Sequence, residues 1–237
     1  MTLASGTVAG ANACASSVTL IRAAELAALP WKNGGGVTRE VAAHPADAGL
    51  DGFVWRMSVA DVAQAGPFSR FAGIDRTLVL LSGAGMLLDE AHSDNAVKTH
   101  ALTRPLDIAR FAGEARIDAR LVDGPTRDFN LMVRRGAARG ELEVWRQTQQ
   151  VQKARQMQQS TQPQSERTLS ADVALLYCAS GALTVTLGDA RANARADAQR
   201  HQLQTGDTLR IEAPNALSCT MEGEGALLAI RLRYTPE

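Results

Sequence analysis

Short runs of alternating apolar and polar residues, separated by turn residues, make up most of this chain. The clearest run is 53–60, in which four large apolar side chains alternate with residues such as Arg56 and Ser58. Because successive side chains of a strand point to opposite faces, Arg56 and Ser58 share the polar face. A second run, 128–134, likewise places Asp128 and Asn130 together on one face, opposite three apolar residues.

The remaining pattern predicts many short strands and almost no helix. Further strands are expected at 18–21, 37–41, 77–81, 86–88, 106–111, 115–121, 142–145, 173–178, 183–187, 208–213 and 227–234. One short helix is expected over 23–29, ended by Pro30. Residues 82–85 predict a β-hairpin between the runs on either side. This pattern is typical of an all-β protein, a sandwich or barrel with few short helices.

An internal echo suggests two similar β units. Ser82-Gly83-Ala84 resembles Ser180-Gly181-Ala182, each lying between apolar runs, and Asp107 is followed at an offset of 100 by Asp207. Chance is the alternative, since turns reuse Gly, Ser and Asp; we favour duplication.

Four segments follow from these changes in pattern. We expect a flexible N-terminus over 1–17, a first unit over 18–145, a flexible Gln-rich insertion over 146–168 and a second unit over 169–237, packed with the first as one compact body. Residues 1–17 lack the basic start and leucine-rich segment of a signal peptide, so a cytoplasmic protein is expected.

Composition argues against several classes of function. Lys+Arg and Asp+Glu are 25 each, so no global field recruits nucleic acid or a membrane. The three cysteines form no CxxC pair and the four histidines no His-x-His, so neither a metal nor another cofactor is predicted. No Gly-x-Ser-x-Gly motif occurs, and no catalytic residue is assigned.

The glycine-rich stretch 30–41 carries an unusual density of polar groups. Gly34-Gly35-Gly36 predicts a tight crossing that leads into the strand 37–41. The polar groups are Lys32 and Asn33 before the crossing and Arg39 and Glu40 after it. A surface loop that opens an edge strand is the alternative interpretation.

Convergent polar groups inside a β cup would form a ligand site, and arginines would hold a carboxylate in a two-pronged way. The candidate ligand-binding residues are Trp31, Lys32, Asn33, Arg39, Glu40, Arg56, Ser58, Phe68, Asp128, Asn130 and Arg134. Arg76 and Arg127 belong to the same basic group but are not among the selected residues. Internal ion pairs with Glu40, Asp75, Asp123 and Asp128 are the alternative role for these arginines.

Three stretches resemble the HutD/Ves family of cupin-fold proteins: LPWKNGGGVTREV (29–41), FVWRMSVADVAQAGPFSRFAGIDRTLVLLSGAGMLL (53–88) and FAGEARIDARLVDGPTRDFNLMVRR (111–135). The resemblance implies a double cupin-like β-barrel or sandwich (a bicupin) in the bacterial cytosol. It also implies a regulatory or binding role toward an acidic product of histidine breakdown, such as formylglutamate or urocanate. Most metal-using cupins look like His-x-His followed by a Glu and a later His, and this chain departs from that pattern.

We therefore expect a binding protein for a small carboxylate metabolite rather than an enzyme. One alternative is a metal-independent isomerase or lyase that uses Glu40 or Asp128 as a base. Another is an interaction protein that acts through a sheet face, with the Gln-rich segment as a tether. A homodimer is left open, and the second unit, which lacks a comparable polar cluster, is expected to be structural or to form a subunit contact.

Overall fold

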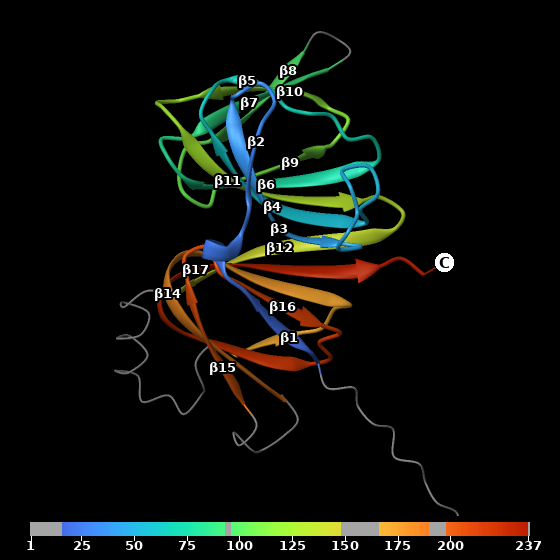
Figure 1. The fold of residues 1–237 in the computed structure, drawn as a ribbon, viewed down its shortest axis with the longest axis vertical. Coiled ribbons are helices and arrows are strands. Elements are labelled where there is room, and N and C mark those ends of the chain that lie inside the picture. The colour runs from blue at the N-terminus through green and yellow to red at the C-terminus, as the bar shows by residue number, and fades with distance from the viewer. Residues whose placement is uncertain (1–15, 93–95, 148–165, 190–197, 237) are drawn as a thin grey trace, which may run out of the picture.

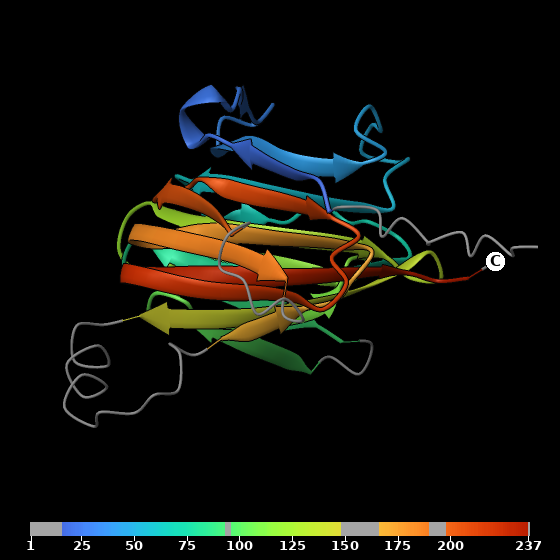
Figure 2. The same cartoon turned by 90° about the horizontal axis from the view of Figure 1, so that it is seen from below.

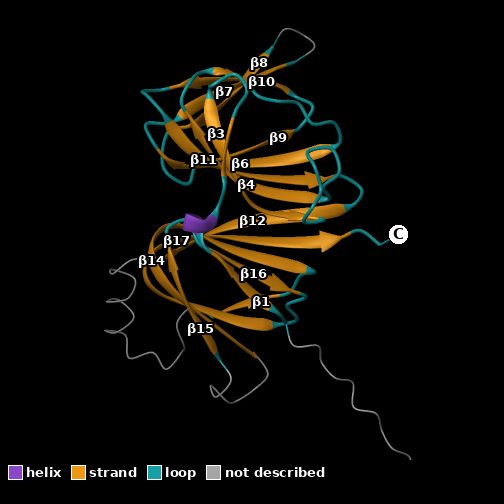
Figure 3. Cartoon of the chain, in the orientation of Figure 1, coloured by secondary structure: helices purple, strands orange, loops and turns teal. Residues whose placement is uncertain are grey.

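The computed structural model describes residues 16–92, 96–147, 166–189 and 198–236. The predicted flexible N-terminus and Gln-rich insertion lie largely outside these ranges. The described part is built of strands and one short 3-10 helix, η1 (Ala23–Glu25), which confirms the all-β prediction (Figure 3). The helix predicted over 23–29 is wrong beyond its first turn, because Leu26 is already extended and β2 follows. No described helix has the length and apolar character needed to cross a membrane.

The N-terminal unit consists of two antiparallel sheets (Figure 1). The six-stranded sheet has the order β2 (Ala28–Pro30), β3 (Gly36–His44), β4 (Trp55–Val62), β11 (Thr126–Arg134), β6 (Ile74–Ser82) and β9 (Ile108–Ala112). The four-stranded sheet has the order β5 (Gly66–Pro67), β10 (Arg116–Leu121), β7 (Met86–Ala91) and β8 (Val97–Leu102).

The C-terminal unit is one strongly curved seven-stranded sheet. Its main path is β1 (Val18–Ile21), β16 (Thr208–Glu212), β14 (Val173–Asp189), β17 (Leu217–Tyr234) and β12 (Ala138–Gln147). Two further strands, β13 (Arg167–Leu169) and β15 (Gln199–Gln204), pair with β17 and β14. In space, β1 and β12 therefore belong to this sheet, although the sequence boundaries group them with the first unit.

The six-stranded sheet is the central layer of the molecule (Figure 1), and the view from below has the seven-stranded sheet in front (Figure 2). One of its faces, which carries Trp55, Met57 and Phe129, packs on the seven-stranded sheet in a continuous apolar core. Its other face contributes Leu78 and Leu80 to a core with the four-stranded sheet. The sheets are not closed into barrels, so the double cupin-like fold is built as packed sandwiches.

The predicted hairpin at residues 82–85 is wrong in its pairing. β6 pairs with β9 and β11, whereas β7 pairs with β8 and β10, so the chain crosses here from one sheet to the other. Gly83 and Gly85 have positive φ and lie so close to neighbouring backbone that a Cβ atom would overlap it. Glycine is therefore required by the switch of sheets rather than by a hairpin turn.

The internal echo has a structural counterpart. The Asp107 carboxylate accepts a hydrogen bond from the Arg104 N–H at 2.9 Å, and the Asp207 carboxylate accepts one from the Gln204 N–H at 3.1 Å. The main chain of Asp107 pairs with Leu80 as that of Asp207 pairs with Cys178, at 3.0 and 2.9 Å. The two units thus repeat one local arrangement of turn and strand.

Candidate functional site

A cavity of about 700 Å³ opens on the side of the six-stranded sheet that faces the four-stranded sheet, and we call it the cup pocket. All candidate residues except Arg39 and Arg134 line it. They are Trp31, Lys32, Asn33, Glu40, Arg56, Ser58, Phe68, Asp128 and Asn130. Alternation explains the grouping, because neighbouring strands present these side chains to the same face. The volume is in the range of small-molecule sites.

The glycine-rich stretch forms the rim of the cup pocket. It is the β2–β3 turn, closed by a hydrogen bond from the Trp31 N–H to the Gly36 carbonyl at 2.9 Å. The Trp31 indole N–H donates to Thr38 Oγ1 at 2.7 Å, and its ring packs over Gly36, where a Cβ would lie 3.1 Å away. The Gly35 N–H donates to Asn33 Oδ1 at 3.0 Å. Glycine at position 36 thus lets the indole form a fixed wall of the pocket.

Arg56 and Glu40 form an ion pair on the floor of the pocket. Arg56 Nε donates to Glu40 Oε2 at 2.7 Å, and Arg56 Nη1 donates to Ser58 Oγ at 3.2 Å. Arg56 is 8 % exposed, so this pair is largely removed from water. Arg56 Nε therefore takes part in an internal ion pair, as the alternative role proposed. Its second terminal nitrogen, Nη2, makes no hydrogen bond to the described residues.

Arg76 is the least satisfied cation of the pocket. It is buried, its Nη1 donates to the Ser69 carbonyl at 3.2 Å, and its Nε has no partner among the described residues. The guanidinium carbon lies 5.3 Å from the ring centre of Phe68 and 5.1 Å from that of Phe111, which favours a cation there. Burial lowers the pKa of Arg76 to about 10, so it stays charged at neutral pH.

Asp128 and Asn130 place unpartnered acceptors in the same space. Asp128 Oδ2 and Asn130 Oδ1 are buried without a hydrogen bond within the part of the chain described. Burial raises the pKa of Asp128 to about 7, and the positive charge of Arg76 opposes that rise. Buried acceptors of this kind cost free energy unless a donor reaches them.

Arg39 and Arg134 lie away from the cup pocket. Arg39 lies on the opposite face of β3 and donates to Asp61 at 2.6 Å. Arg134, at the end of β11, donates to the carbonyls of Phe53 and Asp51 at 2.9 and 2.8 Å. Neither side chain lines the cup pocket.

The selected residues omitted Arg76. Its signal was present in the sequence, because Arg76 alternates with Leu78 and Leu80 and must share their face of β6. The loop residues around Leu50, which also line the pocket, follow no periodic pattern and could not be found in that way.

The second unit is built around apolar side chains. Its interior is an apolar cluster that includes Trp145, Leu176 and Leu203. The histidines do not converge: His100 is paired with Glu90 at 2.9 Å, and the described residues contain no cluster of three metal-ligating side chains.

The cup pocket thus combines cations with unfilled acceptors. Arg56, Arg76 and Lys32 supply positive charge against Glu40 and the partly protonated Asp128. A carboxylate would meet guanidinium donors, while an N–H or O–H on the same molecule would reach Asp128 and Asn130. Trp31 and Phe68 supply apolar walls.

Comparison with known proteins places this geometry in context. The HutD family model matches residues 23–229. An uncharacterized 21.2 kDa protein in the hutC 3′ region of Pseudomonas putida is 41 % identical over 118 residues, which cover 49 % of this chain and 58 % of that protein. Protein Ves of Citrobacter koseri is 36 % identical over 115 residues, which cover 48 % and 56 %. The chain therefore spans somewhat more than half the length of these relatives.

Solved structures agree with the fold. HutD from Pseudomonas fluorescens SBW25, in a formate condition, superposes with a TM-score of 0.71 at 27 % identity, covering 93 % of this chain and 100 % of that one. An oxalate decarboxylase variant of Bacillus subtilis has a TM-score of 0.55 at 9 % identity, covering 98 % and 80 %, and is similar in fold alone.

Proposed function

Because this chain belongs to the HutD family, we propose that it is a regulatory binding protein whose cup pocket takes a small acidic metabolite of histidine breakdown. The molecule would carry at least one carboxylate and one N–H donor, as formylglutamate and urocanate do. In this proposal the protein binds and releases the metabolite in the cytosol.

One observation carries the proposal. Arg76 is a buried cation with an unpartnered Nε, held in the cup pocket by aromatic rings and close enough to Arg56 for the two charges to influence each other. Arg56 is paired with Glu40, but the Arg76 guanidinium has no carboxylate of the described residues within hydrogen-bond distance, and the nearby charge of Arg56 disfavours its own charge. A ligand carboxylate between the two guanidinium groups would relieve that repulsion. This arrangement is costly for a purely structural core and useful for anion recognition.

Asp128 and Asn130 narrow the ligand class further. Their buried acceptors would be satisfied by an amide or imidazole N–H on the ligand. A simple carboxylate without a donor would leave both unsatisfied and should bind less tightly, by about tenfold for each unmade bond.

Calorimetric titration of the whole chain with N-formylglutamate, urocanate, glutamate and histidine tests the proposal. We expect one of the first two to bind, and Arg76→Lys to weaken binding at least about tenfold, because lysine keeps the charge but loses the fork. Arg70→Gln is the matched control, since exposed Arg70 donates only to the Glu114 carbonyl beside the pocket. Absence of binding by all four acids, or equal losses in Arg76→Lys and Arg70→Gln, would refute the proposal.

A second function is favoured by one observation, the burial of the Asp128 carboxyl group in the lining of the cup pocket, which raises its pKa. A carboxyl group with a pKa near 7 inside a ligand pocket is suited to general acid–base chemistry. A metal-independent isomerase or lyase acting on a small carboxylate would use it as the base. Conversion of a bound acid by the wild type but not by Asp128→Asn, followed by NMR, would support this alternative.

A further inference from the structure

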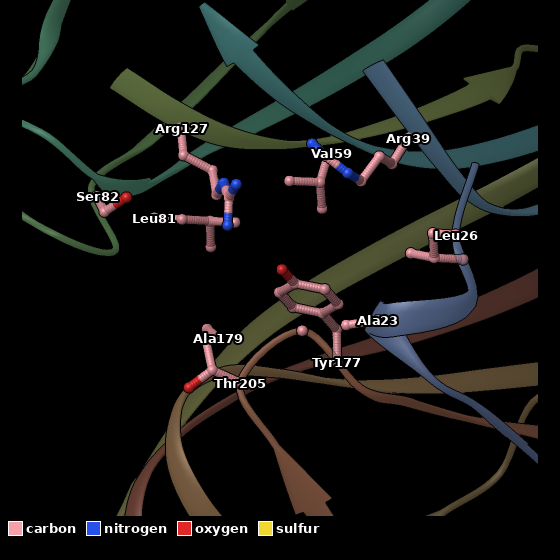
Figure 4. A pocket seen from close by; sticks show the side chains of 11 residues that line it. Ala23, Leu26, Arg39, Val59, Leu81, Ser82, Arg127, Tyr177, Ala179 and Thr205 are labelled. Carbon is pink, nitrogen blue, oxygen red and sulfur yellow. The ribbon is translucent and has the colours of Figure 1, made fainter. Parts of the chain in front are cut away.

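A second cavity lies between the two units, on the opposite face of the six-stranded sheet from the cup pocket. Its volume is about 230 Å³, and we call it the junction cavity. The central sheet contributes Arg39, Val59 and Arg127 to it, and β14 contributes Tyr177 (Figure 4). Each of the first three directly adjoins a residue of the cup pocket in sequence, so alternation along the strands separates the two cavities.

The charged groups of the junction cavity form a cluster with an excess of one positive charge. Arg127 grips Asp61 with Nε at 2.6 Å and Nη2 at 3.0 Å, and Arg39 Nη1 reaches the same carboxylate at 2.6 Å. The hydrogen bond from Arg127 holds the pKa of Asp61 below its usual range, so Asp61 is ionised at neutral pH. Most N–H donors of the two guanidinium groups are left for another acceptor.

Tyr177 faces this cluster from the other unit. Its ring packs on Phe129, with the ring centres 5.1 Å apart, and its hydroxyl points toward Arg127 across the cavity (Figure 4). Tyr177 is 3 % exposed, and its side chain lines the cavity. Burial raises the pKa of Tyr177, so the hydroxyl keeps its proton and remains a donor.

The ion cluster does not itself join the two units. Asp61, Arg39 and Arg127 all belong to the six-stranded sheet, on β4, β3 and β11. The pairing of Arg39 and Arg127 with Asp61 places both guanidinium groups in the lining of the cavity, which Tyr177 lines from the other unit. An anion between them would receive charge-assisted hydrogen bonds from one unit and a hydroxyl donor from the other.

We propose that the junction cavity is a second binding site, separate from the cup pocket, for a short-chain carboxylate. Arg39 and Arg127 bind its carboxylate, the Tyr177 hydroxyl donates to it, and Leu26 and Leu81 contact its carbon chain. The volume equals that of about eight water molecules at roughly 30 Å³ each, so a monocarboxylate with the size of hexanoate matches both the volume and the single excess positive charge. Its binding ties the two units together.

Fluorine NMR of the full chain labelled with 3-fluorotyrosine tests this site directly. The chain has two tyrosines, Tyr177 and Tyr234, and the latter accepts a hydrogen bond from Trp55 at 3.3 Å outside the cavity. Titration with sodium hexanoate at constant ionic strength should shift the Tyr177 resonance saturably and leave the Tyr234 resonance in place. No saturable shift up to about 10 mM hexanoate, ten times a millimolar Kd, would overturn the proposal.

Matched variants separate specific binding from general charge effects. Arg127→Gln should weaken binding at least about tenfold. Arg120→Gln should change the affinity less than about twofold. Arg120 forms the same two-pronged pair with Asp89, but on the four-stranded sheet, away from the junction cavity. Equal losses in both variants would overturn the proposal. So would loss of the Tyr177 shift in Arg76→Lys, since the ligand would then act from the cup pocket.

Discussion

Replacement of Asp128 by asparagine should make the protein more stable at neutral and alkaline pH. Asp128 is 2 % exposed, and burial raises its pKa from 3.8 to about 7. A raised pKa means that the folded state holds the proton more tightly than the unfolded state. Stability contributed by this group is therefore greatest at low pH and is lost as pH rises from about 4 to about 7.

The magnitude follows from the shift itself. A change from 3.8 to about 7 corresponds to about 4 kcal/mol of unfolding free energy, lost progressively over that pH window and constant above it. Asparagine resembles the protonated carboxyl in shape and cannot ionise. The variant should therefore match the wild type near pH 4 and exceed its stability by about 4 kcal/mol at pH 8.

Urea denaturation at pH 4, 5, 6, 7 and 8 measures the difference between the two proteins, in which the other titrating groups largely cancel. Asp123→Asn, in an exposed turn, controls for removal of one negative charge and should change stability by less than about 0.5 kcal/mol throughout. A difference between Asp128→Asn and wild type that stays flat from pH 4 to pH 8 would refute the assignment of Asp128 as a desolvated carboxyl.

Two further predictions concern the repeated turns. Gly181→Ala should lower the unfolding free energy by about 3 kcal/mol, because Gly181 has a φ of 83° and a Cβ would overlap the Glu224 carbonyl oxygen. Gly136→Ala, with a φ of 84° and no atom within 4 Å, should lose only about 1 kcal/mol in the same denaturation assay, and equal losses would contradict the overlap. Asp207→Asn should destabilise the protein by about 2 kcal/mol at pH 7, more than Asp107→Asn does. Burial alone would raise the pKa of Asp207, but hydrogen bonds from the N–H groups of Ala23 and Gln204 keep that pKa below 3.8. The loss of stability in Asp207→Asn should therefore shrink only as pH falls below about 4.

Alternation along the strands was enough to predict much of the cup pocket. Arg56 and Ser58 on β4, and Asp128 and Asn130 on β11, occupy one face because a strand allows only two directions for its side chains. The same rule separates Arg39 from Glu40, and the structure places them in different cavities.

What the sequence could not predict depends on contacts between distant segments. The run of glycine and serine at 82–85 has the composition of a hairpin turn, and only the pairing partners of β6 and β7 show that it joins two sheets. The segment 23–29 has the composition of a helix, yet pairing of β2 with β3 holds its C-terminal end in an extended conformation. Arg134 has the correct alternation along β11 for the pocket but lies at the end of the strand, where it donates to the carbonyls of Asp51 and Phe53 in the loop before β4.

The path of the chain between the sheets has a consequence for synthesis. β1 lies in the seven-stranded sheet and pairs with β16, so Val18 has Ile211 as its partner. Everything from β2 to β11 is inserted between β1 and the rest of that sheet. A nascent chain can therefore complete the inserted domain on the ribosome, while its first strand must wait for a partner made almost two hundred residues later.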